Sequence, residues 1–151
     1  MVKLYFLCGV QGSGKSTFAK TQRVLINGEI VSTDKIRKTY PELEEKYVFP
    51  KAYEIAANYL NQGISVIFDA TNITKDVRIN NLTNIMNNVT VEVETSIIVF
   101  RIDKEECKRR VNIRNSLPGE FFIPLEVIDD YYNKYEPVGK EEGFNNVYII
   151  E

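Results

Sequence analysis

The feature that most constrains this chain is a glycine-rich octapeptide that directly follows an apolar run. Residues Gly9–Ser16 read Gly-Val-Gln-Gly-Ser-Gly-Lys-Ser and match the pattern G-x-x-x-x-G-K-[ST] completely. Its glycines let successive backbone N–H groups converge on phosphate oxygens, and a helix beginning near Lys15 adds its positive N-terminal end. The pattern therefore predicts a strand, a phosphate-binding loop (P-loop) and a helix.

The P-loop also predicts individual contacts to a nucleotide. The Lys15 ammonium is expected at the β- and γ-phosphates of ATP, and the Ser16 hydroxyl is expected as a ligand of Mg²⁺. The alternative is a glycine-rich turn with a solvated lysine. The expected nucleotide-binding residues are Gly9, Gln11, Gly12, Ser13, Gly14, Lys15, Ser16 and Thr17.

Short apolar runs alternate with longer helical patterns along the whole chain. Strands are expected at 3–8, 29–31, 65–68, 95–100 and 147–150. Helices are expected at 15–23, 51–62, 75–86, 104–116 and 124–135, with a helix or turn at 34–39. This alternation predicts an α/β protein, a three-layer P-loop NTPase fold with a mostly parallel five-stranded sheet and a small helical lid. We expect a single domain, 1–151, with the lid at roughly 104–123.

Composition restricts the chemistry and the location. The chain has no histidine, which excludes Ser-His-Asp catalysis and imidazole zinc sites, so acid–base chemistry must use other side chains. Its two cysteines lie far apart and indicate no disulfide framework. Because its apolar runs are short and no signal peptide begins the chain, we expect a cytoplasmic protein without a membrane partner.

Charge is divided unevenly along the chain. Residues 1–114 hold 17 Lys and Arg against 13 Asp and Glu, whereas residues 115–151 hold 2 against 8, for a net charge of −2. The basic excess can form a local face for a phosphate-bearing ligand. The acidic tail disfavours extensive contact with duplex nucleic acid but tolerates a short single-stranded end or a small substrate.

Ligands of parallel α/β sheets gather at the carboxyl ends of the strands, and polar residues follow the second strand there. We interpret Asp34 as the general base for an attacking hydroxyl, with Arg37 one helical turn later holding an anionic group of the acceptor. The structural alternative makes Thr33 or Asp34 a helix cap, or pairs Asp34 with Lys38.

The third strand ends in Asp69-Ala70-Thr71-Asn72. It resembles a Walker B strand, in which Asp69 would help to hold Mg²⁺. The alternative is that Asp69 is a turn or capping residue. Thr71 and Asn72 are equally compatible with a substrate contact and with a role in shaping the turn.

The expected helix 104–116 is rich in arginine. Glu105–Arg109 and Glu106–Arg110 have the spacing of helix-stabilising pairs, so a solvated helix is the plain interpretation. Arg114 differs, because its neighbour one turn earlier is Arg110, a like charge. We therefore favour Arg114, then Arg110, as lid arginines that neutralise the transferring phosphoryl group.

The remaining sequence favours one class of P-loop protein. It contains no Asn-Lys-x-Asp motif of the kind that reads guanine in GTPases. ATPase machines and transporters are generally larger and carry further signature segments. A P-loop chain of 151 residues is therefore most typical of a kinase acting on a small substrate or a nucleic acid.

With these motifs, the chain resembles the kinase domain of polynucleotide 5′-hydroxyl kinases over almost its whole length. The resemblance implies ATP and Mg²⁺ at Lys15 and Ser16, Asp34 as the base, Arg37 at the phosphate beside the acceptor hydroxyl, and a lid arginine. Some members carry that arginine where this chain has Leu117-Pro118-Gly119. The matching segments are Gly9–Thr17, Asp34-x-x-Arg37, Asp69–Asn72, Arg114-Asn115, Ile123–Leu125, Tyr132–Pro137 and Glu142–Phe144.

Three functions are compatible with these residues. The first is transfer of the ATP γ-phosphate to the 5′-hydroxyl end of a polynucleotide. The second is the same chemistry on a small metabolite, nucleoside or sugar alcohol. The third is a non-catalytic ATP-binding module. The acceptor, the preference for DNA or RNA, the adenine contacts and the oligomeric state are open at this point.

Overall fold

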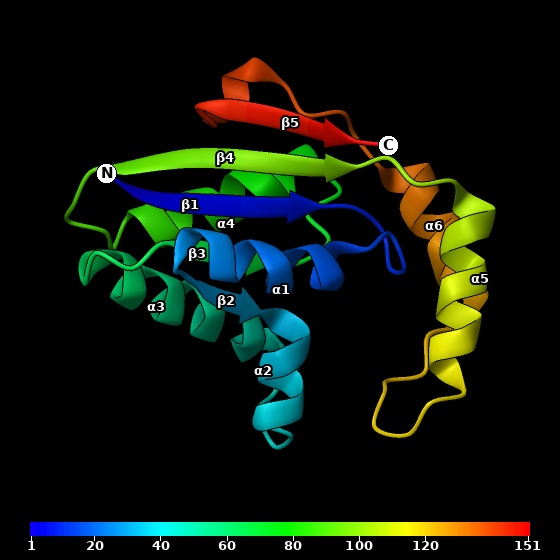
Figure 1. Ribbon diagram of the computed structural model, residues 1–151. Coiled ribbons are helices and arrows are strands. Elements are labelled where there is room, and N and C mark those ends of the chain that lie inside the picture. The colour runs from blue at the N-terminus through cyan, green and yellow to red at the C-terminus, as the bar shows by residue number, and fades with distance from the viewer.

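Five parallel strands form one sheet in the computed structural model, which describes residues 1–151 (Figure 1). Their order is β2-β3-β1-β4-β5, and every neighbouring pair is parallel, which confirms the expected sheet. β1 is central and leads directly into the P-loop. The strands are β1 (Val2–Cys8), β2 (Glu29–Ser32), β3 (Val66–Asp69), β4 (Val93–Phe100) and β5 (Asn146–Ile150).

Helices complete three layers around the sheet. α1 packs on one face, whereas α3 and α4 pack on the other, and α5 and α6 lie together beyond the carboxyl ends of the strands (Figure 1). No helix has both the length and the apolar character needed to cross a bilayer. The helices are α1 (Lys15–Ile26), α2 (Thr33–Thr39), α3 (Val48–Asn61), α4 (Lys75–Met86), α5 (Lys104–Asn115) and α6 (Leu125–Lys134).

The helix beginnings differ from the sequence expectation at two places. The segment 34–39 is a helix, but Ser32 caps α2 by accepting a hydrogen bond from the Lys35 amide at 3.2 Å, so the structural alternative of a cap at Thr33 or Asp34 is wrong. α3 begins at Val48 rather than at 51, because Pro50 is tolerated in the first helical turn. Two short 3₁₀ turns, η1 (Glu45–Tyr47) and η2 (Lys140–Glu142), were not expected.

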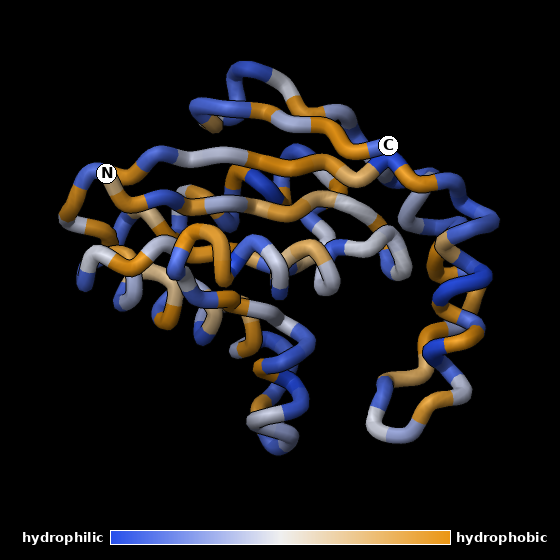
Figure 2. The backbone as a smooth tube through the Cα atoms, viewed as in Figure 1, coloured by the Kyte–Doolittle hydropathy of each residue, from blue (hydrophilic) through white to orange (hydrophobic).

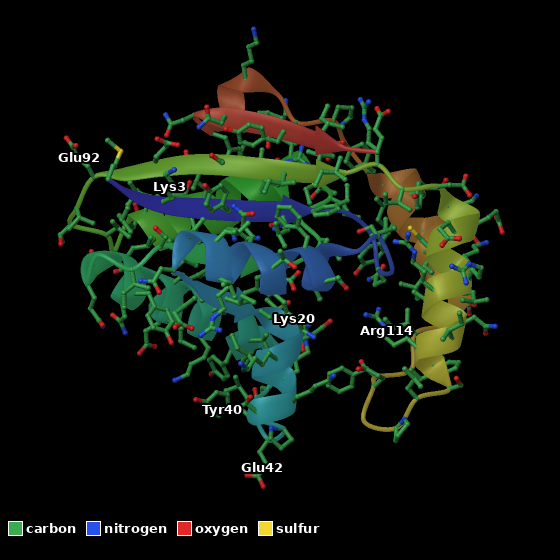
Figure 3. All side chains as sticks on the ribbon, viewed as in Figure 1. Lys3, Lys20, Tyr40, Glu42, Glu92 and Arg114 are labelled. Carbon is green, nitrogen blue, oxygen red and sulfur yellow. The ribbon has the colours of Figure 1, made fainter.

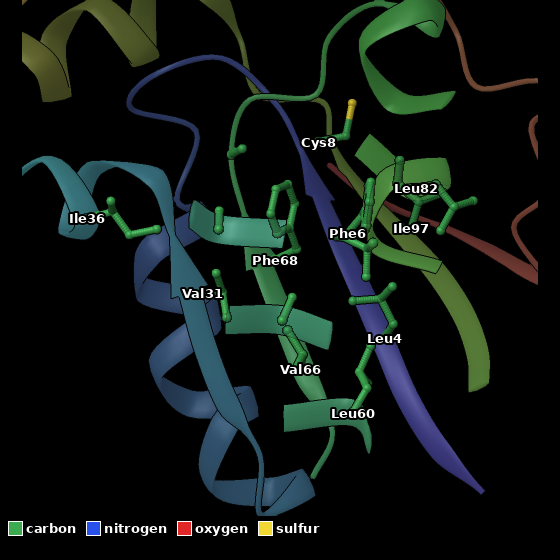
Figure 4. Packing of buried hydrophobic residues seen from close by; sticks show 14 of the residues in the cluster. Leu4, Phe6, Cys8, Val31, Ile36, Leu60, Val66, Phe68, Leu82 and Ile97 are labelled. Carbon is green, nitrogen blue, oxygen red and sulfur yellow. The ribbon is translucent and has the colours of Figure 1, made fainter. Parts of the chain in front are cut away.

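The main hydrophobic core lies between the sheet and α3 and α4. Phe6 of β1 and Phe68 of β3 are fully buried, with ring centroids 5.0 Å apart, and Leu60 and Leu82 close the core from the two helices (Figure 4). Figure 2 shows hydrophobic residues along the carboxyl-terminal half of β4, whereas hydrophilic residues prevail on α2. The buried strands thus hold the P-loop on a rigid base.

A separate apolar cluster packs the α5–α6 pair against the P-loop. Cys107 and Val111 of α5 and Ile128 of α6 are buried together with Val10 of the loop. Gly12 has a φ of +81°, and a Cβ atom there would lie 2.6 Å from the Cys107 carbonyl oxygen. Glycine is therefore required at this position by both the backbone conformation and the close approach of α5.

A buried ion pair ties the C-terminal segment to the loop after β3. The side chains of Arg78 and Glu142 are fully buried, with Arg78 Nε donating to Glu142 Oε1 at 2.6 Å. Arg78 also donates to the carbonyl oxygens of Asn72 at 3.0 Å and Pro137 at 3.2 Å. The sequence did not predict this contact: Arg78 was not singled out, and Glu142 was noted only within the matching segment Glu142–Phe144, because nothing local indicates that the two residues meet.

Replacing Arg78 by Met is expected to lower the free energy of unfolding by about 3–5 kcal/mol, because the Glu142 carboxylate stays buried without its partner. Urea denaturation measures this change. Lys75→Met is the matched control, since it removes an exposed ion pair with Glu141 from the same helix and is expected to change stability little. Equal destabilisation by the two variants would contradict the assignment.

Candidate active site

The P-loop brings its lysine and serine to the carboxyl end of β1, as expected. Lys15 is buried, and its Nζ donates to the Val10 carbonyl oxygen at 3.0 Å. Burial lowers the pKa of this ammonium, and the Asp69 carboxylate partly opposes that shift. Gly9 donates its amide to the Thr71 carbonyl oxygen at 2.9 Å, which joins the P-loop to the segment after β3.

Asp69 lies beside the P-loop serine. The Ser16 hydroxyl donates to Asp69 Oδ2 at 3.0 Å, and Asp69 is buried at the end of β3. Burial raises the pKa of the Asp69 carboxyl, whereas Lys15 and Ser16 lower it. The two residues expected at Mg²⁺ thus lie side by side, and their role as metal ligands stays a prediction.

The donor set fits Mg²⁺ better than a softer metal. Ser16 and Asp69 offer oxygen atoms, and no group of three or more His, Cys, Asp or Glu side chains converges anywhere in the molecule. Mg²⁺ in nucleotide sites is held by one or two such protein oxygens together with phosphate oxygens and water. Two buried P-loop oxygen atoms, Gln11 Oε1 and Ser13 Oγ, also lack any hydrogen-bond partner within the protein.

Asp34 and Arg37 lie one turn apart on α2 and contact each other. Arg37 NH1 donates to Asp34 Oδ1 at 2.7 Å, so the structural alternative that pairs Asp34 with Lys38 is wrong. Lys38 instead donates to Glu120 at 3.3 Å, across from α2 on the loop between α5 and α6. Asp34 thus lies beside Arg37 with its other carboxylate oxygen outside that contact.

Arg37 has a second acidic partner that the sequence did not reveal. Its Nε donates to Glu45 Oε2 at 3.0 Å, and its NH2 donates to Glu45 Oε1 at 2.6 Å. These hydrogen bonds raise the pKa of the Arg37 guanidinium and lower that of the Glu45 carboxyl. Glu45 lies in a run of acidic residues after Pro41, a composition that would ordinarily indicate only an exposed loop.

The arginines of α5 divide into two groups. Arg109 and Arg110 both donate to Glu106, and these contacts lower the pKa of the Glu106 carboxyl to about 2. The expected Glu105–Arg109 pair was wrong, because Glu105 lies near Lys108 instead. Arg110 also donates to the Gly12 carbonyl oxygen at 3.2 Å, which anchors α5 to the P-loop.

Arg114 has no ion-pair partner and projects from α5 toward α1 and α2 (Figure 3). Its charge adds slightly to the burial that lowers the pKa of Lys15, and it opposes the burial that raises the pKa of Asp69. No arginine follows in the segment Leu117-Pro118-Gly119. Arg114 is therefore the cation of α5 that is free to meet an anionic ligand.

Asn72 shapes the turn after β3. The sequence left open whether this residue contacts substrate or shapes the turn, and its hydrogen bonds favour the second role. Its φ is +49°, and its Nδ2 donates to the Leu7 carbonyl oxygen at 2.8 Å. Its Oδ1 accepts from Asn81 Nδ2 at 2.8 Å, so the buried side chain has no group left for a substrate. Thr71, in contrast, contributes to the cavity described next.

A single cavity of about 1170 Å³ joins these groups. It contains Lys15, Ser16, Asp34, Arg37, Asp69, Arg110 and Arg114, so the expected catalytic and metal residues converge at one place. Sequence reasoning missed the other residues that line the cavity, because they come from separate segments without a common motif. These additional lining residues include Phe18, Glu45, Phe49, Phe121, Phe122, Pro124, Val127 and Tyr131.

This arrangement defines a P-loop NTPase of the kinase type, with the phosphate loop after the central strand of a parallel sheet. Residues 4–138 match the model of the AAA_33 family, described as an AAA domain, and the chain belongs to this family of P-loop kinases. Comparison with curated proteins finds no match.

Solved structures of kinases share the fold. A chain of the Pnkp1/Rnl/Hen1 RNA repair complex is 27% identical, with a TM-score of 0.71, over 88% of this chain and 43% of that one. A fungal RNA kinase has a TM-score of 0.69 at 16% identity, covering 99% and 74% of the two chains. A sugar kinase from Janibacter sp. HTCC2649 has a TM-score of 0.70 at 14% identity, covering 99% and 85%. The chain thus spans less than half of the matched chain in the RNA repair complex.

Proposed function

We propose that this chain is an ATP-dependent kinase that transfers the γ-phosphate to the 5′-hydroxyl end of a polynucleotide. The observation that carries the proposal is the position of Asp34 and Arg37, which line the same cavity as Lys15 and Arg114. A carboxylate beside an arginine, facing a P-loop, supplies a base for a hydroxyl and a donor for a neighbouring anion.

Each residue has a distinct role in the proposed reaction. Asp34 accepts the proton of the acceptor hydroxyl, whose oxygen attacks the γ-phosphorus while the bond to the departing ADP breaks. Lys15 and Arg114 neutralise charge on the transferring group. Mg²⁺ held at Ser16 and Asp69 would add further neutralisation of the phosphates. Catalysis is then mainly positioning and charge stabilisation, since phosphoryl transfer needs little covalent help.

The cavity wall supports an acceptor that carries nucleobases. Phe49, Phe121, Phe122 and Tyr131 line it, and Phe122 is 73% exposed. Aromatic side chains near a cationic groove are the usual platform for the bases of single-stranded nucleic acid, whatever their sequence. We assign residues 1–151 to one kinase domain, with residues 104–123 as its lid over the transferring phosphate.

A small-molecule acceptor is the second candidate. It is supported by the contact of Arg37 with Glu45, which leaves fewer free donors on Arg37 for an acceptor phosphate. A non-catalytic ATP-binding module is less well supported, because ATP binding alone does not need Asp34 within the cavity.

An acceptor panel tests the proposal. The purified protein is incubated with γ-labelled ATP, Mg²⁺ and, in separate reactions, 5′-hydroxyl DNA and RNA oligonucleotides, nucleosides and sugar alcohols. We expect label in the oligonucleotides, and none with Lys15→Ala, because that variant removes the ammonium at the phosphates. Exclusive labelling of a small alcohol would reject the polynucleotide acceptor, and ATP binding without labelling of any acceptor would reject catalysis.

A further inference from the structure

The guanidinium of Arg37 is already occupied on one edge. Its Nε and NH2 groups, which point the same way, donate to the two carboxylate oxygens of Glu45 at 3.0 and 2.6 Å. Its NH1 donates separately to Asp34 at 2.7 Å. The edge facing Glu45 is the fork of parallel donors that arginine offers equally to a carboxylate or a phosphate.

The Glu45 carboxylate, which binds the Nε and NH2 groups of Arg37, is exposed to solvent. Its side chain is 68% exposed, it lines the cavity, and it belongs to a 3₁₀ turn of three residues without a side-chain cap. The bidentate contact stabilises the pair, but the Glu45 carboxylate is mostly exposed and can return to water at little desolvation cost. A phosphate can therefore replace the carboxylate without disturbing the core.

We propose that Glu45 is a specificity-determining residue that occupies the anion site of Arg37 until the phosphate next to the acceptor hydroxyl displaces it. The inference rests on the proposed polynucleotide kinase function. Because Asp34 uses NH1 and Glu45 uses Nε and NH2, Asp34 keeps its contact during the exchange. An acceptor with a negative phosphate beside its hydroxyl competes for the fork, whereas a neutral acceptor leaves Glu45 in place.

The contrasting role is structural support. If Glu45 only held Arg37 in position for Asp34, its loss would impair every acceptor, charged or neutral, and would lower kcat. The two roles therefore predict opposite directions of change for a charged acceptor.

The variant Glu45→Gln distinguishes competition for the anion site from structural support of Arg37, because glutamine keeps an oxygen acceptor of the same shape but removes the charge. Glu44→Gln is the matched control: it removes the same charge one residue earlier, where the carboxylate pairs with Lys46 and does not line the cavity. Two 5′-hydroxyl oligonucleotides are compared, one with a natural first phosphodiester and one with an uncharged methylphosphonate there. Fluorescence anisotropy without ATP gives each Kd, and γ-labelled ATP gives KM and kcat.

For Glu45→Gln we expect Kd and KM of the natural oligonucleotide to fall about fivefold, with those of the methylphosphonate and with kcat unchanged. Glu44→Gln should affect both oligonucleotides alike. A loss of kcat on both, or an equal change in both affinities, would overturn the proposal while leaving the kinase function intact. If neither oligonucleotide binds to any of the three proteins, the polynucleotide acceptor fails, and the role of Glu45 fails with it.

Discussion

Asp34→Asn is expected to lower kcat for phosphoryl transfer by about 10²- to 10⁴-fold, the range typical of a lost general base. The amide keeps an oxygen for the hydrogen bond from Arg37, which measures 2.7 Å in the structure, but it cannot accept the proton of the acceptor hydroxyl. Because Asp34 lies outside the P-loop, the Kd for ATP should change little. Steady-state kinetics with the preferred acceptor and equilibrium ATP binding measure the two effects.

Asp76→Asn is a suitable control for this variant. Asp76 is an acidic residue in the first turn of α4, outside the cavity, so its substitution removes the same charge without touching the site. Full activity of Asp34→Asn would eliminate Asp34 as the base. A parallel loss of ATP affinity would instead indicate that Asp34 supports the nucleotide site.

Arg114→Gln is expected to lower kcat by about 10²- to 10³-fold, because the variant removes a cation aimed at charge that develops during transfer. Arg114 is the arginine of α5 without an acidic partner, and it lines the same cavity as Lys15 and Asp69. KM for ATP should rise much less than kcat falls if the contact strengthens in the transition state. Single-turnover measurements report the chemical step directly.

Two variants on the same helix make this prediction specific. Arg109→Gln removes an equal charge outside the cavity and should change kcat little, since the exposed Arg109 pairs with Glu106. Arg110→Gln should have a smaller effect than Arg114→Gln, because Arg110 is engaged with Glu106 and Gly12. A larger loss for Arg110 would transfer the catalytic role to that residue.

Local sequence patterns were sufficient to predict the main strands and helices and the P-loop. The apolar run before Gly9 and the G-x-x-x-x-G-K-S motif specify a strand, a loop and a helix through backbone torsions and N–H groups within a few residues of one another. The period of the apolar residues located the strands to within a few residues. Boundary errors arose where one side chain decided the outcome, as at the cap by Ser32.

Pairings between distant segments were not accessible in this way. Glu45 was not assigned to any element or site, yet it contacts Arg37, and Arg78 is buried against Glu142, which lies 64 residues further along the chain. Helical spacing suggested a separate glutamate partner for each of Arg109 and Arg110. In the structure both arginines pair with Glu106.

The sequence by itself determined the P-loop and the parallel α/β architecture, because these depend on torsional preference and on the period of buried side chains. Only the tertiary structure decided which charges neutralise one another and which stay free. That outcome depends on the distances between segments that packing brings together, and it is why Arg114 faces the cavity unpaired while Arg37 is held between Asp34 and Glu45.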